Sequence, residues 1–111
     1  MRKLPALVVT TALLGASAST ALAAAKTVKV GDNWFVRAGA SNPTVRVTKG
    51  TTVAWRFVGN STHTVSVRKG PVRFSSPFKV SGTYRRKMTR KGTYLLFCKV
   101  HSEQRMRLVV R

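Results

Sequence analysis

The feature that most constrains the fold is a series of short segments in which apolar and polar residues alternate. The clearest is 51–58, where Val53, Trp55 and Phe57 occupy every second position. A period of two is that of a β-strand with one buried face, whereas the residues of a helix face repeat every three to four positions. The pattern predicts strands at 27–30, 45–47, 51–58, 63–68, 83–88, 93–98 and 106–110.

Turn-forming residues separate these strands. Clusters with glycine, proline or asparagine lie at 31–33, 39–43, 49–50, 59–61, 69–71, 81–82 and 91–92. No window shows the apolar stripe of a helix, and a chain of 111 residues has room for one domain of ordinary size. The spacing therefore predicts an all-β Greek-key β-sandwich of about seven to eight strands.

The N-terminal 25 residues have the form of a secretory signal peptide. Arg2 and Lys3 precede an uncharged stretch, 4–25, and small residues satisfy the A-x-A rule at Ala21–Ala23 and again at Ala23–Ala25. The alternative is an uncleaved membrane helix, for which the uncharged run is just long enough. Because its second half is rich in alanine, serine and threonine and only weakly apolar, we expect cleavage and export.

Cleavage would divide the chain into a signal peptide, 1–25, and one domain, 26–111, located in the periplasm, cell envelope or extracellular space. Of the whole chain's net charge of +19, Arg2 and Lys3 account for two, so the domain keeps +17. Such a domain generates a strong positive field. We do not expect nucleic acid as the partner, because the predicted export argues against it and the sequence carries no nucleic-acid motif. We expect an acidic partner protein, anionic envelope polymers or a membrane surface.

Few residues in this chain can carry chemistry. A single cysteine, Cys98, excludes an intramolecular disulfide framework and a zinc site made only of cysteines. Two carboxylates, Asp32 and Glu103, make a paired-carboxylate hydrolase or a multi-carboxylate calcium or magnesium cage improbable. Any chemistry must therefore use one thiol, two imidazoles and neutral or basic side chains.

The thiol and imidazoles occur in a pattern that favours a metal. Cys98 ends an apolar strand, His101 follows it as C-x-x-H, Met106 follows as H-x4-M, and His63 begins another predicted strand. Thiolate, imidazole and thioether together suit copper, in a trigonal His2Cys geometry with a weak axial ligand. The other interpretations are a buried core thiol and surface histidines, or a Cys–His nucleophile, which would need a longer chain and an orienting third group.

Three motifs resemble those of the cupredoxins, small type 1 blue-copper proteins of the plastocyanin/amicyanin type. Lys49–Trp55 is similar to the G-x-x-V-x-W strand of that family, Asn60–His63 to its first-histidine loop, and Lys91–His101 to its G-T-Y-x-x-x-C-x-x-H signature. The resemblance implies a Greek-key sandwich with one type 1 copper ion at one end. It also implies outer-sphere electron exchange with redox partner proteins. We also expect a monomer without enzymatic activity.

The resemblance further implies His63, Cys98 and His101 as equatorial copper ligands, with electrons passing through the exposed edge of His101. The chain departs from the family pattern at two positions. Arg105 stands where a glycine usually precedes the axial methionine, and Thr64 stands where an asparagine usually ties the two ligand loops together.

The axial ligand has three alternatives. Counting from His101, Met106 matches a loop of plastocyanin length and is the first choice. Aligning the last strand instead gives a loop of amicyanin length, with Gln104 at the axial position, as in stellacyanin-like members of the family. The third alternative is no protein axial ligand.

The sequence thus predicts an exported electron carrier. The alternatives are an envelope protein that binds or delivers copper without electron transfer, and a metal-free cationic envelope-binding module. Trp34 and Phe35 are adjacent in the chain. One of them is therefore a candidate to face outwards near the copper end as part of a docking patch.

Overall fold

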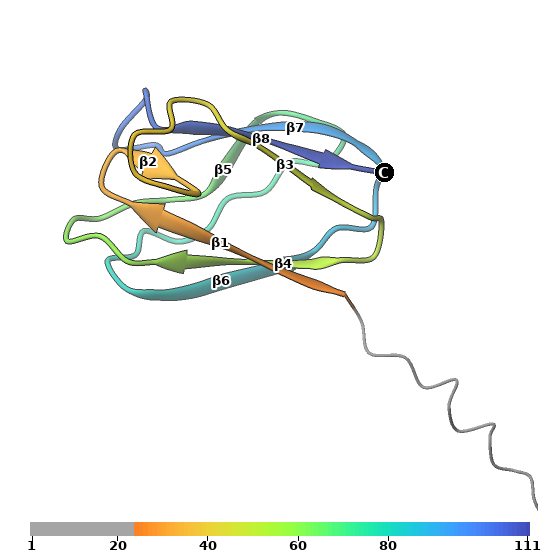
Figure 1. The fold of residues 1–111 in the computed structure, drawn as a ribbon, viewed down its shortest axis with the longest axis horizontal. Helices are drawn as coiled ribbons and strands as arrows, with labels where there is room; N and C mark the ends of the chain where they lie inside the picture. The colour runs from red at the N-terminus through yellow and green to blue at the C-terminus, as the bar shows by residue number, and fades with distance from the viewer. Residues whose placement is uncertain (1–23) are drawn as a thin grey trace, which may run out of the picture.

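The computed structural model describes residues 24–111, so nearly all of the predicted signal peptide lies outside the described residues. Figure 1 shows two β-sheets packed face to face, which confirms the predicted all-β sandwich. Its eight strands are β1 (Ala25–Gly31), β2 (Trp34–Phe35), β3 (Thr44–Val47), β4 (Thr52–Phe57), β5 (Ser66–Lys69), β6 (Gly82–Lys87), β7 (Gly92–Phe97) and β8 (Arg105–Val110). Among these residues there is no helix long and apolar enough to cross a membrane.

Each sheet contains four strands, in the orders β2-β1-β4-β6 and β3-β8-β7-β5. The pairs β1–β4 and β3–β8 are parallel and the other pairs are antiparallel. Because β1 runs parallel to β4 with Val30 opposite Phe57, both strands end at the same end of the sandwich. The turn after β1 therefore meets the loop after β4, although the two are about thirty residues apart in sequence.

Apart from shifts of one or two residues at strand ends, the strand predictions differ from the structure in two places. The two-residue β2 was not predicted, because alternation cannot be recognised over two positions. The strand predicted at 63–68 begins only at Ser66, and His63 instead forms an isolated bridge with Lys79. The first histidine therefore lies in a loop that is held by backbone hydrogen bonds, from His63 N to Lys79 O (2.9 Å) and from Lys79 N to His63 O (3.0 Å).

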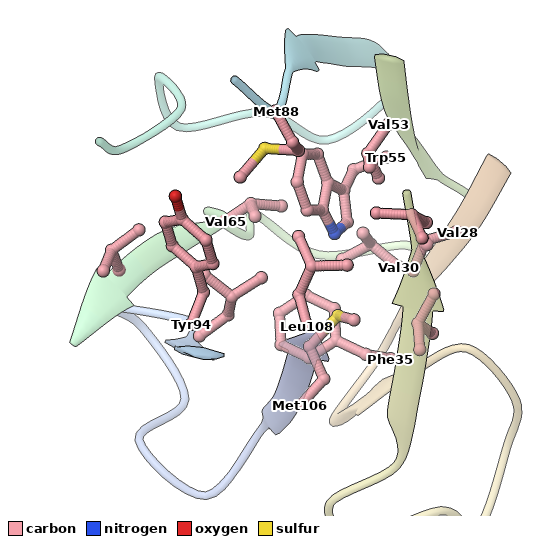
Figure 2. Packing of buried hydrophobic residues seen from close by; sticks show 14 of the residues in the cluster. Val28, Val30, Phe35, Val53, Trp55, Val65, Met88, Tyr94, Met106 and Leu108 are labelled. Atoms are coloured by element: carbon pink, nitrogen blue, oxygen red, sulfur yellow. The ribbon is translucent and has the colours of Figure 1, made fainter. Parts of the chain in front are cut away.

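The core lies between the sheets and is filled by the alternating residues of the strands (Figure 2). Trp55 from β4 and Tyr94 from β7 are fully buried, and the Tyr94 hydroxyl donates to the carbonyl of Arg90 (2.8 Å). Phe35 is also fully buried, so it belongs to the core and not to a docking patch. A close-packed support of this kind holds the strand ends in place, and those ends carry the candidate ligands.

Candidate metal centre

Three candidate ligands meet at one end of the sandwich. Cys98 follows β7, His101 lies in the loop between β7 and β8, and His63 lies between β4 and β5. The Cys98 Sγ lies 3.8 Å from the His63 Nδ1 and 3.7 Å from the His101 Nδ1. The ligand atoms of the three residues all lie within 4.8 Å of one another.

These separations suit a single bound metal ion. Metal–ligand bonds of about 2.0 Å to nitrogen and 2.3 Å to sulfur, at a trigonal angle, place nitrogen and sulfur about 3.7 Å apart. The Sγ–Nδ1 distances of 3.8 and 3.7 Å match that value. With one thiolate and two imidazoles as donors, the cluster fits one type 1 copper site.

The loop from Cys98 to Gln104 is closed by its own backbone. Cys98 N donates to the carbonyl of Gln104 (3.1 Å), and Gln104 N donates to the carbonyl of His101 (2.9 Å). This closure follows from the β7–β8 register, in which Phe97 lies opposite Arg105. The two ligands of the C-x-x-H motif are thereby fixed relative to each other, with Cys98 fully buried and His101 half-buried.

Thr64, the position at which the resemblance led us to expect an asparagine, links the two ligand loops. Its backbone N donates to Cys98 Sγ (3.5 Å), and its Oγ1 accepts a hydrogen bond from Lys99 N (3.0 Å). A second contact joins Thr64 Oγ1 and Ser66 Oγ (2.9 Å). The hydroxyl of Thr64 therefore connects the two ligand loops directly.

His63 is held from behind by Asp32. The Nε2 of His63 lies 2.8 Å from Asp32 Oδ1, and the His63 side chain is fully buried whereas that of Asp32 is 42% exposed. Because a carboxylate only accepts, Nε2 must carry a proton. The neutral ring is then left with an unprotonated Nδ1, which faces Cys98 Sγ. Hydrogen bonds from His63, from Asn60 N and from Ser61 hold the pKa of Asp32 well below its usual range.

Asp32 is the site residue that sequence reasoning missed. The sequence shows Asp32 only as one of the chain's two acidic residues, placed in a predicted turn. Nothing in the sequence connects it with His63. The turn bends sharply at Asn33, whose φ is +69°. The facing loop approaches so closely that a Cβ on Gly59 would clash with the Asp32 carboxylate. The need for glycine at position 59 indicates this contact, but the sequence alone does not show which residue the glycine makes room for.

The two axial candidates have different surroundings. The Gln104 Nε2 donates to the carbonyls of Gly31 (2.8 Å) and Trp34 (2.7 Å), which fixes the orientation of the amide. Its Oε1 is buried without a hydrogen-bond partner; in the described residues the other such side-chain atom is the Trp55 Nε1, in the apolar core. Met106 lies in β8 opposite Leu96, and its side chain belongs to the hydrophobic core (Figure 2).

The fold is shared with solved copper proteins. A variant of amicyanin in its Cu(I) form matches with a TM-score of 0.66 and 25% identity, over 86% of this chain and 89% of that one. A purple cupredoxin from Nitrosopumilus maritimus matches with a TM-score of 0.65 and 18% identity, over 78% of this chain and 99% of that one.

A copper-containing nitrite reductase from Thermus scotoductus SA-01 matches with a TM-score of 0.62 and 23% identity. That match covers 78% of this chain but only 22% of the reductase chain. The sequence matches no protein-family model and no curated protein. The structural similarity therefore carries the comparison, and it supports a small cupredoxin that resembles amicyanin.

Proposed function

We propose that this chain, which has the cupredoxin fold, is an exported blue-copper protein that carries single electrons between redox partners. The observation that carries the proposal is the convergence of His63, Cys98 and His101 at separations that suit one ion. A thiolate with two imidazoles is the donor set of blue-copper electron-transfer sites. Loops fixed by the strand ends support this function, because ligands held in place rearrange little between oxidation states.

When bound, copper supplies a one-electron redox couple. The chain supplies two ligands that are shielded from water and a third that reaches the surface. Cys98 and His63 are fully buried, whereas His101 is half-buried. We expect electrons to enter and leave through the imidazole of His101.

Adding Cu(II) to the metal-free domain tests the function directly. We expect an intense visible absorption from thiolate-to-copper charge transfer, the electron-spin resonance of a type 1 site, and rapid reversible reduction by a small electron donor. The Cys98→Ser variant should lose the absorption. A colourless copper-loaded wild type would overturn the proposal. Colour without rapid redox cycling would favour copper delivery, and absence of copper binding would favour a metal-free envelope-binding module.

For the fourth donor we propose Gln104 in place of Met106, the first choice from loop length. The buried Oε1 of Gln104 has no partner, although an unpaired buried acceptor costs about 1–3 kcal/mol. Both hydrogens of its Nε2 are used by backbone carbonyls, so the oxygen is the atom that is available to a metal ion. A bound ion would remove this cost, whereas the Met106 thioether already has apolar neighbours in the core.

We propose a carrier and not an enzyme. The chain contains two histidines, and both are used in the one cluster. The match to amicyanin extends over 89% of that chain, whereas the match to nitrite reductase extends over 22% of that chain. Both observations favour a protein with one redox centre and no second metal site for a substrate.

The docking surface that we propose surrounds the copper end. Four large apolar side chains of the described residues are exposed: Val58 41%, Phe78 61%, Val80 49% and Val100 48%. Val100 precedes His101 in the chain, and Phe78 and Val80 flank Lys79, which bridges to His63. Val58 lies two residues before Asn60, in the loop that leads to His63. An apolar surface around His101 would let a partner approach closely and exclude water during electron exchange.

We propose that the partner is acidic. Both carboxylates of the chain belong to loops at the copper end, so the outward faces of the sheets carry only positive charge. On one face Arg46, Lys69 and Arg107 line a groove of about 480 Å³. Electron exchange should be faster with an anionic small complex than with a cationic one, and the difference should shrink as salt is added. Equal rates would contradict an acidic partner, and tight binding to anionic vesicles would indicate a membrane surface.

Export remains part of the proposal, and it is supported by the charged start, uncharged stretch and small residues of 1–25. Mass spectrometry of the protein from its native cells would test it. We expect a mature chain that begins at Ala24 or Lys26. A chain that retains Arg2 and Lys3 would favour the membrane-helix alternative.

A further inference from the structure

Asp32 accepts several hydrogen bonds from one loop, although its side chain is 42% exposed and could be solvated by water. It accepts hydrogen bonds from Asn60 N at both oxygens (3.1 and 3.0 Å), from Ser61 N (3.2 Å) and from Ser61 Oγ (2.9 Å). The contact with His63 Nε2, at 2.8 Å, is the shortest of the set. The loop that precedes His63 is thus wrapped around this one carboxylate.

We propose that Asp32 is a positioning residue for the copper site, which fixes the tautomer and orientation of His63 and stabilises the oxidised ion. This inference rests on the proposed function and extends it to a residue outside the ligand set. Carboxylates that accept from a ligand imidazole fix its ring and increase its basicity, and their loss commonly lowers metal affinity by about 10- to 100-fold.

The orientation part follows from hydrogen-bond chemistry. Oδ1 accepts from Nε2, so the neutral ring presents Nδ1 towards Cys98 Sγ. The Ser61 hydroxyl also lies 3.1 Å from Nε2, and it donates to Asp32, so it strengthens the same arrangement. Without the carboxylate, either ring nitrogen could carry the proton and the loop would lose its anchor.

The charge part follows from the composition of the chain. In a chain with 21 Lys and Arg and 2 Asp and Glu, the general field opposes a doubly charged ion. One carboxylate hydrogen-bonded to a ligand ring counters that field at short range, and it favours Cu(II) over Cu(I). We therefore expect its removal to weaken Cu(II) binding more than Cu(I) binding, and hence to raise the reduction potential.

Glu103 offers a matched control. It is the other carboxylate of the chain, it lies between His101 and Gln104 in sequence, and it is exposed. Within the described part of the chain its side chain makes no hydrogen bond to a ligand. Glu103→Gln therefore removes one negative charge from the ligand loop without touching the Asp32–His63 contact.

The test compares Asp32→Asn, Asp32→Ala and Glu103→Gln with the wild type in two measurements. In the metal-free proteins, imidazole nitrogen NMR shifts report the His63 tautomer. We expect the Nε2–H form in the wild type, in Asp32→Asn, which keeps an acceptor at Oδ1, and in Glu103→Gln, but a mixture in Asp32→Ala. Because this measurement needs no copper, it tests the geometry even if the proposed function fails.

In the copper-loaded proteins, titrations give the Cu(II) and Cu(I) affinities, and voltammetry gives the potential. For Asp32→Asn we expect Cu(II) affinity to fall about tenfold more than Cu(I) affinity, which corresponds to a rise of about 59 mV. Glu103→Gln should shift the potential much less. Equal shifts in Asp32→Asn and Glu103→Gln, or an Nδ1–H tautomer in the metal-free wild type, would overturn the proposal.

Discussion

The two imidazoles of the site are equally distant from the thiol but differ in how they are held. Their Nδ1 atoms lie 3.8 and 3.7 Å from Cys98 Sγ, and their ring centroids are 4.8 Å apart. His63 is fully buried, paired with Asp32 and bridged to Lys79. His101 is half-buried on a short loop, and within the described residues no hydrogen bond involves its Nε2.

This difference separates two tasks that a redox site must perform. If the protein carries electrons as proposed, the imidazole of His63 would keep the ligands in place, so that little rearrangement would accompany a change of oxidation state. The half-buried imidazole of His101 would connect a bound ion with the surface. A site with two buried rings would exchange electrons slowly, and a site with two surface rings would admit water and lose its shape.

The largest expected effect comes from deleting each ring in turn. His63→Gly and His101→Gly should both lose the intense visible absorption, because each removes an equatorial ligand. Free imidazole should restore the absorption in His101→Gly, since that ring lies at the surface. It should not do so in His63→Gly, where the ring is completely buried. Titration with imidazole, followed by absorption spectroscopy, measures the contrast. Equal rescue of both variants would contradict the distinction between the two rings.

A second effect concerns Gln104, which connects the turn that contains Asp32 with the loop that contains His101. Its side chain binds carbonyls on either side of Asp32, and its backbone N binds the carbonyl of His101. If Gln104 is the fourth donor, Gln104→Leu should change the electron-spin resonance and raise the potential. Met106→Leu conserves the size and apolarity of a core residue, so it should cost less than about 1.5 kcal/mol of unfolding free energy and leave the spectrum unchanged. A spectral change in Met106→Leu alone would restore Met106 as the axial ligand.

The same division explains what could be predicted from the sequence. Cys98 and His101 lie three residues apart after an apolar strand, so local pattern was enough to join them. Trp55 and its alternating neighbours likewise predicted β4. Contacts between distant segments were not accessible: Asp32 is 31 positions from His63, and Gln104 is 73 positions from Gly31.

Those contacts depend on the register of the parallel pair β1–β4, which brings the turn after Gly31 beside the loop after Phe57. Alternation indicates which face of a strand is buried, but it does not indicate which strand is its neighbour. Loop length alone also gave two answers for the axial ligand. The choice of Gln104 rests on its buried Oε1, which has no partner, and on the backbone carbonyls of the distant turn that orient its amide.

A third, smaller effect is expected at Thr64, which joins the two ligand loops. Thr64→Val keeps the shape but removes the acceptor for Lys99 N and the partner of Ser66 Oγ. Lys99 is exposed and Ser66 Oγ keeps Ser75 Oγ as a partner (2.7 Å), so the loss is that of ordinary hydrogen bonds. It should lower the unfolding free energy of the metal-free protein by about 0.5–1.5 kcal/mol. Denaturant unfolding measures this loss, and Thr64→Ser, which keeps the hydroxyl, should retain most of the stability. A larger loss in Thr64→Ser than in Thr64→Val would contradict this prediction, because it would mean that the methyl group, not the hydroxyl, stabilises the loops.

The smallest effect should appear beside His101 and leave the site itself intact. Val100→Ser replaces a 48% exposed apolar side chain next to this ring, so the spectrum and potential should not change. If partners dock there, electron self-exchange should slow by roughly three- to tenfold, because two copper ends must exclude water between them. Leu95→Ser is the control: it removes an apolar side chain from the cationic groove on the outer face of β7. Stopped-flow or NMR exchange measurements should find the Leu95 variant unchanged. An equal slowing in both variants would mean that the surface beside His101 has no special part in docking. The difference between the two imidazoles would then concern only how they are held within the site.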